Sequence, residues 1–366
     1  MKKILEETQF SRLMQQQNQL LERQNDLLAR LVEQKTFGDR LLDGEKVFVR
    51  NLFRDEVRDG FFVDAQRKRL WNIQLNLVAE VARICKKHSI RWFAFGGTLL
   101  GAARHKGFVP WDDDVDISML RPDYEKFKRV LPTEIRPPFF VDSWQNYKLE
   151  GENLPDENLQ LVMQQQRQEH PKWWPFWPII KLRDSRTTMI QWPERQHVHQ
   201  GVWIDIFPFD AVPPFSEKKP AVVFEAAREL LHAIVLPDTM IQALKNNLPL
   251  VLSRKNLERF LNLPHNKKAA EFDAFMLKNF LPSGFVGQVR GHCMTKNKLS
   301  YALKNFDETI YLPFELMEVP APKGYEDCLT AQYGDWHTPK VFKSHVKTFS
   351  ADISYAEYFR TVKPEE

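Results

Sequence analysis

Residues 112–116 form an acidic run that reads Asp-Asp-Asp-Val-Asp. A strand is predicted over residues 114–118, and strand side chains alternate between two faces, so Asp114 and Asp116 face the same side and Asp112 shares that parity. Two unit charges about 4 Å apart repel by about 1 kcal/mol in water and about 4 kcal/mol at an effective dielectric of about 20. The run therefore needs a cation. Oxygen ligands favour Mg²⁺ or Mn²⁺, whereas zinc favours histidine and cysteine.

Gly96, Gly97 and Thr98 form a turn of small residues between a predicted strand over residues 91–95 and a predicted helix. Backbone N–H groups at such a turn can hold a phosphate at the helix N-terminus, and the threonine hydroxyl adds a donor. A Gly-Gly turn alone is usually only a turn, and an acidic run alone is usually a solvated loop. Here the turn ends one strand and the acids open the next, which favours a joint site for phosphate and metal.

Apolar periodicity predicts helices alternating with short strands. An amphipathic helix is predicted over residues 66–88, directly before the strand that ends in the glycine turn. The other predicted elements, in chain order, are helices over 98–104 and 122–131, strands over 179–182, 187–191 and 202–207, a mainly helical region over 217–281, and a helix over 325–332. This order predicts an α/β (α+β) domain with a small mixed sheet and the helical region packed beside it.

The N-terminus has the pattern of a short coiled coil. Residues 4–35 contain no glycine or proline, and apolar residues occupy heptad a and d positions, namely Phe10, Leu13, Leu20, Leu27 and Leu31. We expect this helix to form a homo-oligomer, with packing against the body or a partner as the alternative. The predicted organisation is a coiled-coil helix over 1–35, a linker or docking segment over 36–65, a catalytic domain over 66–345 and a C-terminal tail over 346–366.

Composition narrows the functional classes. The net charge is +4 and the basic residues are scattered, so no nucleic-acid partner is expected. Three cysteines without a CxxC pair indicate neither a disulfide framework nor a structural zinc site. The sequence shows no secretion signal and no apolar stretch near the roughly 20 residues of a membrane span. A cytoplasmic location is therefore expected, with peripheral attachment at the inner membrane face as a compatible variant.

The stretch FAFGGTLLGAARHKGFVPWDDDVDIS resembles the signature of LicD proteins, relatives of fukutin in the nucleotidyltransferase superfamily. The resemblance extends from about residue 88 to about residue 340, so it excludes the N-terminal helix. It implies a nucleotidyltransferase fold for the catalytic domain, with Asp114 and Asp116 as the metal-binding pair and a third carboxylate on a later strand.

The block GVWIDIFP at residues 201–208 is similar to a second sequence block of the family and nominates Asp205 as the third carboxylate. The expected metal ligands are thus Asp112, Asp114, Asp116 and Asp205, of which the last three are also the expected catalytic residues. Lys181 and Arg104 lie in the region of resemblance and are expected to contact phosphate. Asp210 is interpreted as a cap of the strand end.

The family's chemistry implies transfer of phosphocholine from CDP-choline, or of a polyol phosphate from a donor such as CDP-ribitol, to a hydroxyl of a cell-surface glycan such as lipopolysaccharide or teichoic acid, with release of CMP. One alternative is a nucleotidyltransferase that attaches NMP to protein or RNA. Another is a non-catalytic scaffold that binds nucleotide or glycan. A group of tryptophans either packs in the core or stacks on sugar or choline, namely Trp173, Trp174, Trp177 and Trp192.

Overall fold

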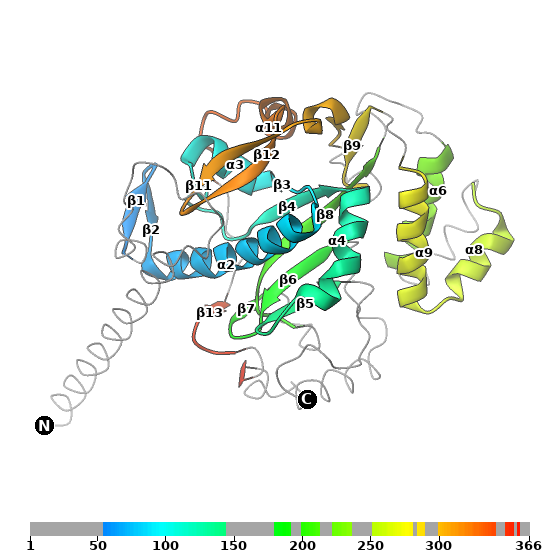
Figure 1. Cartoon of the computed structure of the whole chain (residues 1–366), viewed down its shortest axis with the longest axis horizontal. Coiled ribbons are helices and arrows are strands. Elements are labelled where there is room, and N and C mark those ends of the chain that lie inside the picture. Colours follow the sequence, from blue (N-terminus) through cyan, green and yellow to red (C-terminus); the bar gives the residue numbers. More distant parts are fainter. Residues whose placement is uncertain are drawn as a thin grey trace, which may run out of the picture.

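The computed structural model describes residues 54–143, 179–191, 199–212, 222–235, 251–280, 284–289, 299–341, 348–354 and 357–358. Its α-helices are α2 (Ala65–His88), α3 (Gly96–His105), α4 (Arg121–Glu134), α6 (Val222–Val235), α8 (Arg254–Leu261), α9 (His265–Lys278) and α11 (Tyr325–Tyr333), with a short 3₁₀ helix at Leu303–Phe306. The strands are β1 (Glu56–Arg58), β2 (Phe61–Val63), β3 (Phe93–Phe95), β4 (Asp116–Leu120), β5 (Phe139–Ser143), β6 (Ile180–Asp184), β7 (Thr188–Ile190), β8 (Val202–Ala211), β9 (Phe285–Gly287), β10 (Tyr301–Ala302), β11 (Thr309–Phe314), β12 (Met317–Pro322) and β13 (Thr348–Ser350). Figure 1 shows them as one mixed α/β arrangement.

The largest sheet is built around the long strand β8. Residues 202–206 of β8 pair with β6 on one edge, residues 205–209 pair with β4 on the other, and the last two residues pair with β9. β3 and β5 extend the sheet beyond β4 and β6. Only the β4 and β8 pair runs parallel among the pairings of this sheet in the described residues, and the others are antiparallel. The predicted mixed sheet is therefore confirmed.

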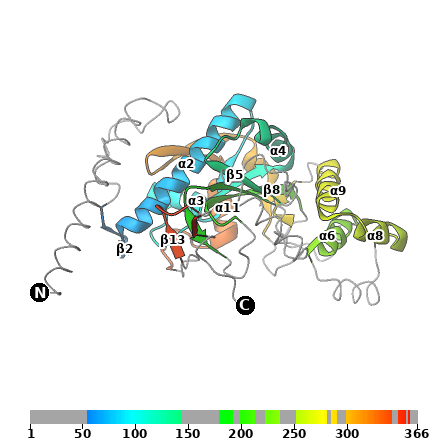
Figure 2. The same cartoon turned by 90° about the horizontal axis from the view of Figure 1, so that it is seen from below.

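Alternation along β4 and β8 puts three isoleucines on one face of this sheet, and puts Asp116 and Asp205, together with aromatic side chains such as Phe207, on the other. Ile117, Ile204 and Ile206 are almost wholly buried, and Asp116 and Asp205 point to the opposite side and remain partly exposed. The amphipathic helix α2 and helix α4 pack against the sheet, α2 over β6 and β8 and α4 over β4 and β8 (Figures 1 and 2). Asp116 and Asp205 therefore lie on the face opposite the three isoleucines.

Helices α6, α8 and α9 lie beside the sheet and have an apolar cluster of their own (Figure 1). A buried ion-pair network joins this helical unit to the body. Arg121 donates to both carboxylate oxygens of Asp210 at 2.7 and 2.8 Å and to Asp273 of α9 at 3.1 Å. Lys128 reaches the other Asp273 oxygen at 2.8 Å. The interpretation of Asp210 as a strand cap is wrong, because its fully buried carboxylate pairs with Arg121.

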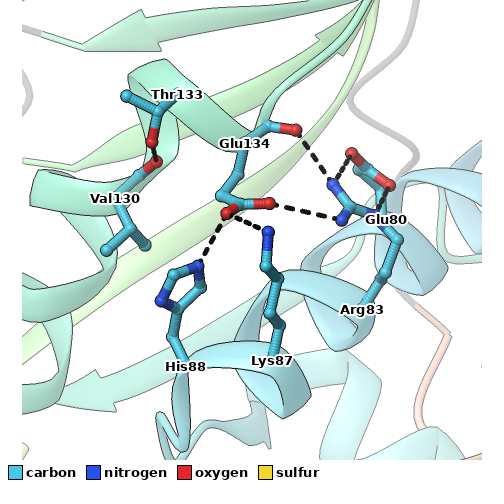
Figure 3. Close-up of polar contacts among 7 residues, drawn as sticks. All are labelled: Glu80, Arg83, Lys87, His88, Val130, Thr133 and Glu134. Carbon is cyan, nitrogen blue, oxygen red and sulfur yellow. Dashed lines mark hydrogen bonds and ion pairs between the residues drawn. The ribbon is translucent and has the colours of Figure 1, made fainter.

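The C-terminal ends of α2 and α4 are tied together by Glu134 (Figure 3). Its carboxylate accepts from Lys87 at 2.6 Å and lies 2.8 Å from His88 Nε2, and its carbonyl accepts from Arg83 at 2.9 Å. These basic contacts lower the pKa of Glu134 to about 2. This connection fixes α2 relative to the sheet.

Several predictions fall outside the described residues, among them the N-terminal coiled coil, most of the linker segment and the tryptophans at 173, 174, 177 and 192. Residues 56–63 of the predicted linker form the hairpin β1 and β2, and residues 348–350 of the predicted tail form β13, which pairs with β7. Among the described residues, no helix is both long and apolar enough to span a bilayer.

Candidate metal and phosphate site

A row of charged residues crosses the face of the sheet opposite Ile117, Ile204 and Ile206. Asp116 of β4 lies opposite Asp205 of β8, and Asp205 lies opposite Lys181 of β6. Residues directly opposite each other in a sheet point to the same face. Lys181 Nζ approaches Asp205 Oδ1 to 2.5 Å. The structure therefore brings together three residues that are separated by up to 89 positions in the chain.

The acidic run enters this row from one end. Asp112, Asp113 and Asp114 have ligand atoms that all lie within 4.8 Å of one another. β4 begins only at Asp116, so the predicted alternation of Asp112 and Asp114 along a strand is wrong. Instead, the chain changes direction at a turn in which the Asp112 N–H donates to the Val109 carbonyl. This turn also places Asp113 beside Asp112 and Asp114.

The glycine turn packs directly against the carboxylates. It forms the first residues of α3, where Gly96 has a φ of +56°. A Cβ on Gly96 would lie 2.6 Å from Asp116 Oδ2, and one on Gly97 would lie 2.0 Å from Asp112 Oδ2. Thr98 Oγ1 accepts from the Asp116 N–H at 2.9 Å and so fixes the start of β4. Both glycines are needed because no side chain fits between the helix N-terminus and the acids.

The site carries an excess of negative charge. Five carboxylates gather here, those of residues 112, 113, 114, 116 and 205, with Lys181 as the basic residue in contact with one of them. Burial, followed by repulsion from Asp114, raises the pKa of both Asp112 and Asp116 well above the ordinary value. A side-chain hydrogen bond with Asp114 also raises the pKa of Asp112. A cation in the site would relieve this repulsion.

The residues present fit a hard divalent cation. All candidate ligands are carboxylate oxygens, which Mg²⁺ and Mn²⁺ prefer, and neither histidine nor cysteine belongs to the group. The absence of a Cβ on the two glycines lets the α3 N-terminus, whose backbone N–H groups favour anions, lie directly against the carboxylates. Metal and phosphate can therefore be held side by side.

Arg104 lies at the end of α3 and makes contacts that the sequence did not predict. Its Nη1 donates to the carbonyls of Trp336 and Thr338 at 2.7 and 3.5 Å and ties α3 to the segment after α11. His105 beside it places Nε2 2.6 Å from Asp59 Oδ2. Contact between Arg104 and phosphate remains a prediction.

Sequence reasoning missed a set of donors on α2 and a tyrosine. The side chains of Arg67, Trp71 and Gln74 donate to the backbone of the acidic run. Gln74 is a polar residue on an otherwise apolar helix face. That exception to the apolar pattern could have predicted this contact from the sequence. Tyr333 of α11 also faces the acids: burial, and then Asp116, Asp112 and Asp114, raise its pKa.

Residues of this chain match a known protein family and three known proteins. Residues 89–221 match the family described as "LicD/FKTN/FKRP, nucleotidyltransferase domain". The chain is 27% identical over 267 residues to the lipopolysaccharide cholinephosphotransferase LicD of Haemophilus influenzae, and this covers 72% of the chain and 88% of that protein. Over 56 residues it is 39% and 38% identical to uncharacterized proteins of Rickettsia typhi and Rickettsia prowazekii, which covers 15% of the chain and 18% and 21% of those proteins.

Proposed function

Because residues 89–221 form a LicD-family nucleotidyltransferase domain, we propose that this chain is a metal-dependent transferase that moves a phospho-alcohol from a CDP-activated donor to a hydroxyl of a cell-surface glycan. The observation that carries the proposal is the row of Asp116, Asp205 and Lys181 beside the acidic run and the glycine turn. The named activity of the Haemophilus relative favours phosphocholine over a polyol phosphate, and lipopolysaccharide as the acceptor.

Distinct tasks follow for the residues of the site in this proposal. Asp112, Asp114, Asp116 and Asp205 would hold Mg²⁺ or Mn²⁺, which when bound would stabilise the negative charge of the reacting phosphates. The N–H groups at the start of α3 would contact the donor phosphates. Lys181, whose Nζ lies 2.5 Å from Asp205 Oδ1, would donate a further hydrogen bond to a phosphate oxygen.

Transfer requires that the acceptor hydroxyl lose a proton. Its oxygen forms a bond to the phosphorus next to the alcohol, the bond between that phosphorus and the CMP oxygen breaks, and a carboxylate takes the proton. Asp112 and Asp205 are the two candidates for this proton acceptor. Asp205 also pairs with Lys181, 2.5 Å away.

The decisive experiment measures CMP release from CDP-choline, CDP-ribitol and CDP-glycerol with Mg²⁺ and an extract of surface glycans. We expect release from CDP-choline above all, and a loss of at least about 100-fold in Asp116→Asn, since a metal clamp contributes several kcal/mol. Asp327→Asn on the exposed face of α11 is the matched control and should keep full activity.

The rival chemistry makes the opposite prediction about the acceptor. Mass spectrometry of the modified glycan should show added phosphocholine, whereas an NMP-transferring enzyme would leave the nucleotide on protein or RNA. CMP release from none of the three donors, by a folded protein, would refute the donor class. Full activity in Asp116→Asn would refute the role of the site.

A further inference from the structure

Three side chains on one face of α2 hold the backbone of the acidic run. Arg67 Nη1 and Trp71 Nε1 donate to the Asp112 carbonyl oxygen at 2.9 and 3.1 Å, and Gln74 Nε2 donates to the Asp113 carbonyl oxygen at 2.8 Å. Steps of four and three residues keep these donors on one side of a helix. Arg67, Trp71 and Gln74 are called the α2 donor face below.

The acidic run depends on these donors because it has little regular structure of its own. Residues 112–115 belong to neither a helix nor a strand. Asp112 and Asp113 are almost fully buried, and a buried carbonyl without a partner is costly. A carbonyl oxygen has two lone pairs, and Arg67 and Trp71 together occupy both on Asp112.

The donors are themselves rigidly held. Gln74 is fully buried on a helix face whose neighbours Leu70 and Val78 belong to the hydrophobic core. An amide is costly at such a position unless it forms a hydrogen bond. The Trp71 ring stacks on Phe108, with 4.7 Å between ring centroids and an interplanar angle of 2°. Rotation of either side chain away from the acidic run would therefore disturb the core.

We propose that the α2 donor face is a set of positioning residues for the metal site and sets the separation of the Asp112, Asp113 and Asp114 carboxylates. By fixing two successive carbonyls, it fixes the Cα positions from which these side chains reach a common point. The inference rests on the proposed function. It reaches beyond the matched family segment, since all three donors precede residue 89.

Gln74→Leu tests this inference on the full-length chain. Leucine fills a similar volume and removes the donor, so the core stays packed and the Asp113 carbonyl loses its partner. We expect the dissociation constant for Mn²⁺, measured by EPR or calorimetry, to rise roughly 10-fold, as for other partners that orient metal ligands. The Tm of the metal-free protein should fall by only roughly 2–4 °C. Trp71→Phe, which keeps the ring stack, should weaken Mn²⁺ binding in the same direction.

Two controls separate positioning from general stability. Gln66→Leu makes the same change on the same helix, where the amide donates to the Phe349 carbonyl, and should leave Mn²⁺ affinity unchanged. Val81→Ala opens a void in the buried face of α2 and should lower Tm without altering Mn²⁺ affinity.

The outcomes distinguish this inference from the proposed function. If the wild-type protein binds Mn²⁺ and both Gln74→Leu and Trp71→Phe bind it within twofold of wild type, the positioning role is refuted and the proposed function stands. An equal loss of affinity in Val81→Ala would also refute it, because affinity would then follow stability alone. A wild-type protein that binds no Mn²⁺ would overturn the metal-dependent function, and the inference with it.

Discussion

Two clusters of buried charge lie five residues apart on β8 and have opposite character. Around Asp210, the carboxylates of Asp273 and Glu125 are matched by Arg121 and Lys128. Around Asp205, five carboxylates gather beside Lys181. The first cluster is nearly neutral and joins two parts of the protein. The second carries an excess of negative charge, which supports the proposal that its acids hold a cation.

The largest effect is expected from breaking the balanced cluster. Arg121→Met leaves Asp210 and Asp273 buried without their shared partner and should lower the free energy of unfolding by about 3–5 kcal/mol. Urea denaturation measures the loss, and Arg129→Met on the exposed side of α4 is the control. By contrast, metal-free Asp116→Asn should be no less stable than wild type. A loss below about 1 kcal/mol in Arg121→Met would contradict the contrast between the clusters.

A smaller effect should follow from removing the lysine of the acidic cluster. Lys181→Met would remove the charge-assisted hydrogen bond that we propose to the donor phosphate, typically about 1.5–3 kcal/mol, so kcat/KM for CMP release should fall about 10-fold to 100-fold. Mn²⁺ affinity should rise, because the site loses a positive charge. Lys304→Met at an exposed position is the control. Weaker Mn²⁺ binding in Lys181→Met would show that the lysine supports the ligands rather than the phosphate.

The acidic cluster should also make stability depend on pH. The raised pKa values of Asp112 and Asp116 mean that the metal-free folded protein binds more protons than the unfolded chain above about pH 4, the ordinary range of aspartate. Stability should therefore fall as pH rises through the raised values. Thermal unfolding at a series of pH values measures this slope. Asp112→Asn with Asp116→Asn should flatten it, and the stabilisation by Mn²⁺ should grow as pH rises.

The smallest effect is expected at Glu134, a second cluster with matched charges (Figure 3). Hydrogen bonds from Lys87 and His88 lower its pKa to about 2. The contribution of Glu134 to the free energy of unfolding is present above about pH 4.5 and is lost as pH falls toward 2. This pH dependence is the reverse of that of the acidic cluster. Glu134→Gln should reduce this acid sensitivity slightly, with no change in Mn²⁺ affinity. Unfolding measured between pH 2 and pH 5 tests this prediction. A change of Mn²⁺ affinity in Glu134→Gln would contradict it and would show that the Glu134 cluster and the acidic cluster are energetically coupled.

Local sequence predicted α2, α3, α4, α11 and the strands β3, β4, β6, β7 and β8 to within about four residues, but it predicted none of β1, β2, β5 and β9 to β13. The helix expected over residues 66–88 is α2 at 65–88, and the strand expected over 202–207 is the first part of β8. The regular spacing of apolar residues along the chain determines such elements directly. The strand expected over 114–118 begins instead at Asp116, although the Val115 carbonyl already accepts from the Asp205 N–H at 2.8 Å. Hydrogen bonds from α2 hold the carbonyls of Asp112 and Asp113 before it. These hydrogen bonds come from a helix about 40 residues earlier in the chain. Local periodicity carries no information about contacts between such distant segments.

The sequence by itself determined the chemistry: a glycine turn, an acidic run and a later aspartate whose residue types suit phosphate and a hard cation. Tertiary structure decided their arrangement. Strand pairing placed Asp205 beside Asp116 and Lys181, whereas Asp210 on the same strand was matched with Arg121. The pairing of distant strands and the burial of their side chains decide which charges are balanced by an opposite charge and which are not. Strand pairing and burial depend on register and packing rather than on neighbours in the chain.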